Sequence, residues 1–292
     1  MDAPGLGIEA SLAERGWAVL ELQDPTVVTE VRDLLLGHLR IANPNLGSLG
    51  EYHCVVSEEN HFDSLHDLAG FYWEFQLGRL IISHNLDVFK RLIGPDLHIQ
   101  NHPYLRAVRP HQNADAAPLH RDTYYGASPF EVSVLVPFGD TDSHSSLRVI
   151  SGSHIEPDTA YPFVQTVNPD VAIQSVKHRL GYPYAPRVLD PSLVSRAERV
   201  PLKLGQVLIF TLGLVHGGGT NVSSETRFSS DIRLANSLAP VAWSRGVRHD
   251  YYVPLCTSSV TQSARLLLEA NAVANTATDT PTNASANPQA VE

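Results

Sequence analysis

The chain has 292 residues, a net charge of −10 and a hydrophobic fraction of 43%. An acidic chain argues against nucleic-acid binding, which needs a basic surface to follow the phosphates. No apolar run approaches the roughly 20 residues that span a bilayer, so we expect no membrane partner. Cys54 and Cys256 lie far apart and form no CxxC pair, which predicts a chain without a disulfide framework and a cytoplasmic location.

The first third of the chain predicts helices that follow one short strand. The strand is expected over 16–22, and a helix over 27–39, where Val28, Val31 and Leu35 recur at helical spacing. Residues 45–60 are rich in Gly, Asn and Glu and predict a loop. Two further helices are expected over 64–77 and 79–93, the second ending at Gly94-Pro95. The helical part therefore covers about 24–95.

The rest of the chain predicts strands. Short segments rich in Val, Ile, Phe and Tyr alternate with turn residues, at 97–100, 104–108, 130–137, 147–150, 207–210 and 227–234. This spacing favours an antiparallel sandwich or barrel over about 96–240, with a long excursion at 168–195. We expect one domain over 1–256. Residues 257–292 are rich in Ala, Thr, Asn and Ser and predict a disordered tail.

Two side chains of the segment 119–122 are of metal-ligand type. His120 and Asp122 stand at i and i+2, so on a strand they project from one face while Arg121 faces away. An imidazole and a carboxylate on one face make two of the three ligands of a facial metal site. Because an HxD pair occurs by chance in many chains, the pair alone is weak support.

His216 is the candidate for the third ligand. It follows the strand-like run 207–215 and precedes three glycines, which would let a large ligand approach closely. Two histidines and one carboxylate leave coordination positions open for a co-substrate and dioxygen, an arrangement that suits non-haem iron(II).

A polar strand face begins eleven residues after His216. On a strand over 227–234, one face would carry Arg227, Ser229, Asp231 and Arg233. A solvated sheet face would explain this pattern. A guanidinium fork also binds a carboxylate through two hydrogen bonds, so we predict that Arg227 anchors a dicarboxylate and that Ser229 donates one more bond.

Four segments resemble the phytanoyl-CoA dioxygenase family of iron(II)/2-oxoglutarate oxygenases. They are AERGWAVLEL near the N-terminus, PLHRDTYYG (118–126), SSLRVISGSH (145–154) and HGGGTNVSSETR (216–227). The similarity covers roughly residues 10–240. The joint order of the HxD pair, the Gly-Ser-His, the later histidine and the following arginine makes the resemblance specific.

The resemblance implies a mainly β fold with flanking helices, built on a double-stranded β-helix (jelly-roll or cupin-like) core. It implies that His120, Asp122 and His216 bind iron(II), and that Arg227 holds the co-substrate 2-oxoglutarate. Such an enzyme would consume O2, release succinate and CO2, and hydroxylate or otherwise oxidise a small-molecule substrate of the kind found in specialised metabolism. Related halogenases have a small residue at the position of Asp122, so we expect oxidation rather than halogenation.

The sequence departs from the family pattern at two points. The family's hydroxyl two residues after the distal histidine is Gly218 here, so Ser229 or Thr220 would supply that hydrogen bond. The usual Asn-Gly before the Gly-Ser-His strand is replaced at 144–146 by His-Ser-Ser, which changes a turn rather than a ligand. Arg106, on a neighbouring predicted strand, is a further candidate for positioning 2-oxoglutarate or substrate.

Two other classes of protein are consistent with the same residues. A non-catalytic cupin-like module could bind a small molecule on the polar face, and purified protein would then bind no metal. A zinc hydrolase could use the same three ligands with one open position. The hydrolase hypothesis leaves Arg227 without a role, and no separate general base stands out near the motif.

Overall fold

The computed structural model describes residues 7–164, 176, 180, 187–188, 191–240 and 251–278. Most of the predicted excursion at 168–195 therefore lies outside the described residues. The α-helices before residue 96 are α1 (Ile8–Arg15), α2 (Thr26–Ala42), α3 (Tyr52–Val55), α4 (His61–Glu74), α5 (Leu77–His84) and α6 (Leu86–Ile93). A separate helix, α8 (Ser259–Thr278), follows the last strand.

The strands form antiparallel sheets. They are β1 (Trp17–Glu21), β2 (Leu97–Gln100), β3 (Tyr104–Val108), β4 (Glu131–Pro137), β5 (Leu147–Val149), β6 (Phe163–Val164), β7 (Arg187–Val188), β8 (Glu198–Val200), β9 (Gln206–Thr211), β10 (His216–Gly217), β11 (Arg227–Asn236) and β12 (Tyr252–Cys256). The larger sheet has the order β1-β9-β4-β11-β2-β12, with β3 also paired to β11, and the smaller has the order β10-β5-β8.

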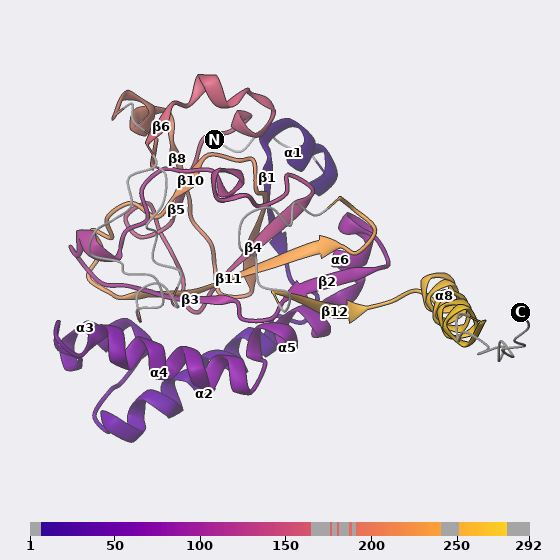
Figure 1. Cartoon of the computed structure of the whole chain (residues 1–292). Helices are drawn as coiled ribbons and strands as arrows, with labels where there is room; N and C mark the ends of the chain where they lie inside the picture. The colour runs from indigo at the N-terminus through magenta and orange to yellow at the C-terminus, as the bar shows by residue number, and fades with distance from the viewer. Residues whose placement is uncertain are drawn as a thin grey trace, which may run out of the picture.

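Two hydrophobic clusters hold these layers together. The larger lies between the outer face of the main sheet and the helices, where Val31 of α2 and Leu65 of α4 meet Val134 and Ile209. Figure 1 shows α2, α4 and α5 along one side of the sheets. The smaller cluster joins the two sheets, with Leu147, Val149 and Val200 of the smaller facing Leu135, Leu208 and Phe210 of the larger.

This architecture confirms the predicted double-stranded β-helix with flanking helices. Alternation along β11 explains how one strand serves two environments, because successive side chains point to opposite faces. Phe228, Ile232 and Leu234 pack among the helices, which leaves Arg227, Ser229, Asp231 and Arg233 on the opposite face, toward the smaller sheet. The long strand pairs with β3 through 227–231 and with β4 through 229–235.

The N-terminal elements differ from the prediction in two details. Residues 45–60 were expected to be a loop but contain a 3-10 turn (Leu49–Glu51) and α3, because Leu49 and Tyr52 are buried against the core. The helix expected over 79–93 is divided into α5 and α6 at Asn85. The buried Asn85 side chain accepts a hydrogen bond from the amide of Asp24, which fixes the break against the start of the chain.

The structure also differs from the predicted disordered tail. Residues 259–278 form α8, where Ala264, the Leu266–Leu268 run and Glu269 are strong helix formers. Figure 1 shows α8 apart from the β-sheets, and Leu266, Leu267 and Leu268 are exposed. Among the described residues, none of the helices has both the length and the apolar character that crossing a membrane requires. Cys54 and Cys256 are free thiols, in agreement with the absence of a predicted disulfide framework.

Candidate metal centre and co-substrate site

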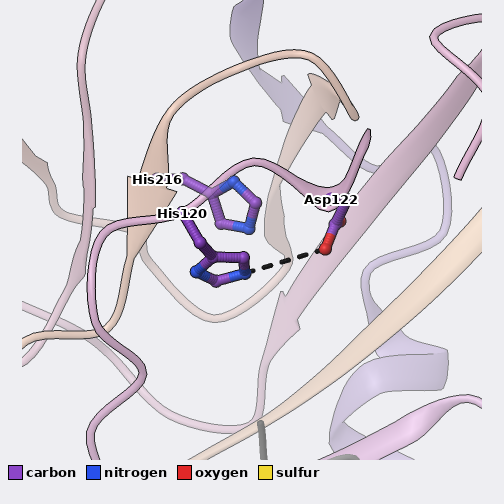
Figure 2. A group of neighbouring side chains, drawn as sticks. All are labelled: His120, Asp122 and His216. Atoms are coloured by element: carbon purple, nitrogen blue, oxygen red, sulfur yellow. Dashed lines mark ion pairs between the residues drawn. The ribbon is translucent and has the colours of Figure 1, made fainter. Parts of the chain in front are cut away.

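The two candidate histidines lie on segments that bind each other through the backbone. The amide of His120 donates to the carbonyl of His216 at 2.8 Å, and the amide of His216 donates back at 2.9 Å. This reciprocal pair is an isolated antiparallel bridge, and it brings the two rings to a centroid separation of 4.4 Å. Residues 96 positions apart in sequence are thus fixed side by side (Figure 2).

Both imidazoles are oriented by the same kind of contact. Nδ1 of His120 lies 2.7 Å from the carbonyl of Pro118, and Nδ1 of His216 lies 3.0 Å from that of Leu214. A carbonyl only accepts, so Nδ1 carries a proton in each ring and Nε2 is the ring nitrogen that remains available to a metal ion. Metal-binding histidines are commonly fixed in this way. Burial, followed by the nearby His120, lowers the pKa of His216 to about 4, so this ring is neutral at pH 7, as a ligand must be.

Asp122 completes the cluster. Arg121 has extended backbone angles (φ −111°, ψ 141°), so His120 and Asp122 project to one side even though Asp122 itself opens a 3-10 turn rather than continuing a strand. Asp122 Oδ1 lies 3.7 Å from Nε2 of His120 (Figure 2). Burial opposes the charged form, but Arg233, His120 and His216 outweigh it and hold the pKa of Asp122 well below its ordinary value.

The donor set fits a divalent metal ion. One possible ligand atom from each of His120, Asp122 and His216 lies within 4.8 Å of the other two, and small side-chain movements would bring these atoms to bond lengths of about 2.0–2.2 Å around one ion. Oδ2 of Asp122 is buried and has no hydrogen-bond partner among the described residues. A buried carboxylate oxygen without a partner is costly, and a metal ion would satisfy it.

The Gly-Ser-His turn at 152–154 supports both ligand segments. The hydroxyl of Ser153 accepts a hydrogen bond from the amide of Val215, next to His216, at 2.8 Å. Arg121, between the other two ligands, points away from them and donates to the carbonyls of Ser153 and Glu156. The turn therefore ties together the two chain segments that carry the cluster. The His154 side chain contacts a different part of the chain, because its Nε2 lies 3.1 Å from the carbonyl of Ala13.

Gly217 allows these segments to approach. A Cβ atom at this position would lie 2.7 Å from the carbonyl oxygen of Pro118 and 2.9 Å from the amide nitrogen of Leu119. Backbone atoms at such distances would have to move. The glycine was expected to make room for a ligand, whereas here it makes room for the neighbouring backbone that presents His120.

Arg227 and Ser229 form the candidate co-substrate anchor. Both are buried on the polar face of β11. Nη1 of Arg227 donates to the carbonyl of Ser145 at 2.6 Å, while its Nε and the hydroxyl of Ser229 have no hydrogen-bond partner in the described part of the chain. Burial, together with the positive charges of Arg199 and Arg106, lowers the pKa of Arg227 to about 10, and the guanidinium remains charged at pH 7. Two buried donors on one face suit a carboxylate.

The other two candidates for co-substrate binding differ in position. Arg106 of β3 lies directly across from Ser229 in the sheet, and its guanidinium lies 5.0 Å from the centre of the Tyr104 ring. The hydroxyl of Thr220 donates to the Asn113 side chain at 2.7 Å, at an exposed position. The structure therefore brings Arg106 beside the anchor and directs the hydroxyl of Thr220 elsewhere.

Arg233 is a residue whose contact with the cluster sequence reasoning did not predict. The strand pattern placed it on the polar face, but its Nη2 lies 2.9 Å from Oδ1 of Asp122. This contact joins residues 111 positions apart, and only the packing of the 3-10 turn against β11 creates it.

A double-stranded β-helix that carries a buried His-Asp-His cluster defines a non-haem metal oxygenase. The family model described as phytanoyl-CoA dioxygenase (PhyH) matches residues 50–229, well over half of the chain. The protein belongs to this family, whose members are iron(II)/2-oxoglutarate oxygenases. The resemblance proposed from the sequence is confirmed, and so is the enzyme class. No curated protein matches the sequence.

Three solved structures are similar to this chain at low sequence identity. The non-heme monooxygenase ThoJ, in its apo form, is 16% identical with a TM-score of 0.53, and the match covers 92% of this chain and 95% of that one. EvdO2 from Micromonospora carbonacea var. aurantiaca, complexed with 2-oxoglutarate, is 16% identical with a TM-score of 0.49, over 86% and 99% of the two chains. EctD from S. alaskensis is 17% identical with a TM-score of 0.48, over 83% and 84%. Of these three, ThoJ supports the fold, and none defines a substrate.

Proposed function

We propose that this protein is an iron(II)- and 2-oxoglutarate-dependent oxygenase that hydroxylates or otherwise oxidises a small molecule of specialised metabolism in the cytoplasm. His120, Asp122 and His216 would hold the iron, and Arg227 with Ser229 would hold 2-oxoglutarate. The observation that carries the proposal is the buried cluster in which both histidines have Nδ1 engaged by a backbone carbonyl and Nε2 available to a metal ion. Family membership supports the reaction class.

One set of residues in the site would bind the metal, and another would bind the co-substrate. With O2, bound iron(II) and 2-oxoglutarate would supply an oxidant strong enough to attack a C–H bond, with succinate and CO2 as co-products. Three protein ligands leave the remaining coordination positions for the co-substrate and O2. Arg227 gives the distal carboxylate a charged partner, and Ser229 supplies a second donor from the same strand face. Since both are buried, water competes little for these hydrogen bonds.

The donors beside the candidate metal ligands favour an iron-dependent oxygenase over a zinc hydrolase. Hydrolytic zinc sites also use three ligands. They have no need of the two buried donors on β11, Nε of Arg227 and the hydroxyl of Ser229, that have no hydrogen-bond partner among the described residues. Those two orphan donors fit a dicarboxylate. We therefore retain oxidation as the proposed chemistry.

The test is an anaerobic titration of the purified protein with iron(II) and then 2-oxoglutarate. We expect the weak visible charge-transfer band of a chelated 2-oxo acid, lost in His216→Ala and requiring more 2-oxoglutarate in Arg227→Ala. Succinate should form once O2 is admitted. Metal binding without the band would support a zinc hydrolase, and no metal binding would support a non-catalytic binding module.

A further inference from the structure

The guanidinium of Arg233 is largely buried and makes an ionic contact with the candidate metal ligand Asp122 rather than with the acid nearer to it in sequence. Nη2 lies 2.9 Å from Oδ1 of Asp122, and the two side chains are 13% and 5% exposed. The strand carries Asp231 two residues earlier, on the same face. A guanidinium in this environment would be expected to pair with the acid beside it, so the choice of Asp122 needs an explanation.

The other two acids near Arg233 have hydroxyl donors of their own. Asp231 accepts a hydrogen bond from the hydroxyl of Ser133. Glu131 accepts one from the hydroxyl of Tyr252 at 2.6 Å and another from the amide of Ser128 at 3.2 Å. Asp122 is therefore the one of these three acids that the guanidinium contacts directly, in addition to the contact of Asp122 with His120.

The contact leaves Asp122 able to bind a metal ion. An ionised carboxylate has about four lone-pair positions on its two oxygens. Arg233 uses one on Oδ1, and Oδ2 has no hydrogen-bond partner among the described residues. The guanidinium thus fixes where the carboxylate lies and leaves acceptor positions on it available for a metal ion.

Stability alone is a weak reason for such a pair. Removing two charges from water costs about as much as their attraction returns, so a buried ion pair adds little compared with apolar packing. Outer partners of metal ligands, by contrast, orient the ligand, and their loss commonly weakens metal binding about 10- to 100-fold. The geometry around Asp122 matches this second role.

We propose that Arg233 is the positioning residue of the metal centre: it holds the Asp122 carboxylate in place before the metal arrives and balances its charge. This inference rests on the proposed metal site and deepens it. Its chemical consequence is that removal of the Asp122 side chain leaves a buried guanidinium beside the metal position. A small carboxylate such as formate would bind there and replace the lost ligand.

The experiment measures Mn(II) affinity without O2, so that no turnover is needed. We compare wild type, Arg233→Lys and Arg233→Met, with Arg109→Met as the matched control. Arg109 is also buried and pairs with a buried aspartate, Asp115, but it does not contact the cluster. We expect Arg233→Met to weaken Mn(II) binding about 10- to 100-fold, Arg233→Lys to recover part of the loss, and Arg109→Met to change the affinity less than about threefold.

A second measurement uses formate and compares two variants that both lack the Asp122 side chain. In Asp122→Ala, added formate should tighten Mn(II) binding, and the double variant Asp122→Ala, Arg233→Met should lose this response. The inference is overturned if Arg233→Met binds Mn(II) like wild type or loses no more than Arg109→Met, or if the double variant still responds to formate. A wild-type protein that binds no Mn(II) would instead refute the proposed metal site, and the inference with it.

Discussion

The chemistry of the site depends at the residue scale on where single protons and donors lie. Two backbone carbonyls hold Nδ1 of His120 and His216, so each ring has Nε2 available for a metal ion. The co-substrate anchor is also defined by single atoms, because Nε of Arg227 and the hydroxyl of Ser229 are buried donors without partners in the described chain. Ser229 and Thr220 are both candidates for the hydroxyl that binds 2-oxoglutarate, and substitution of each is expected to have a different effect.

Ser229→Ala should weaken 2-oxoglutarate binding about tenfold, since a hydrogen bond to a charged group contributes about 1.5 kcal/mol or more. The measurement is the 2-oxoglutarate dependence of the anaerobic charge-transfer band. Thr220→Val is the control, because that hydroxyl already donates to Asn113, and it should leave the dependence unchanged. The opposite ranking of the two variants would move the anchor to Thr220.

Sequence reasoning reached the ligands of this site but not their supports. An HxD spacing and a histidine before glycines are local patterns, and the structure brings all three side chains together. The contact between Arg233 and Asp122 depends on which turn lies over which strand. The close approach at Gly217 depends on the bridge between two distant segments. Neither of these two tertiary contacts can be predicted from the composition or the residue spacing of the sequence.

At the scale of secondary-structure elements, the candidate metal ligands lie on short segments rather than on long strands. β10 has two residues, and Asp122 begins a 3-10 turn, so little regular structure holds them. The Gly-Ser-His turn supplies the missing rigidity through Ser153 and Arg121. Strands with alternating burial, such as β2 and β3, were predicted to the residue, whereas this tertiary support was not.

Ser153→Ala should lower the free energy of unfolding by about 1–3 kcal/mol, because it leaves the buried amide of Val215 without its acceptor. It should also weaken Mn(II) binding, since that amide is next to His216. Urea denaturation and Mn(II) titration measure the two effects. Ser151→Ala, on the same turn, removes hydroxyl contacts to Trp17 and Glu198 rather than to a ligand segment, and it should affect metal binding little. Equal effects of both variants would show that the turn has no specific role.

The whole molecule should lose stability in mild acid. His61 of α4 is completely buried, and burial lowers its pKa to about 4 against the opposing charge of Asp115. Its unfolded pKa is about 6.5. Between these values the unfolded chain binds a proton that the folded protein does not, so the free energy of unfolding falls as the pH falls from about 6.5 towards 4. His216 contributes in the same direction.

The variant His61→Gln isolates this contribution. Between pH 7 and 4.5, metal-free wild type should lose about 2 kcal/mol more than the variant does. Urea denaturation at several pH values measures the difference. Parallel stability curves for the two proteins would mean that His61 titrates normally in the folded state.

The C-terminal helix tests the proposed domain boundary at the same scale. The Ser258 side chain donates to Asp96 at 2.9 Å, whereas the described side chains of α8 are mostly exposed. Truncation after Ser258 should therefore change the free energy of unfolding by less than about 1 kcal/mol and leave Mn(II) affinity unchanged. A large loss in either quantity would place α8 within the folded domain. The sequence predicts at most one or two helical turns over 265–274, because helix formers are interleaved there with polar residues typical of tails, whereas α8 covers Ser259–Thr278.

β11 carries the co-substrate anchor at Arg227 and, six residues later, the partner of a metal ligand at Arg233. The strand rises about 3.4 Å per residue, which separates their Cα atoms by roughly 20 Å. Substitutions on its outer face can be absorbed by repacking. A single inserted or deleted residue between the two arginines cannot, because it would turn one of them to the opposite face. In the evolution of this protein, the length of the 227–233 segment should therefore be inherited unchanged, while insertions accumulate in the surface loops.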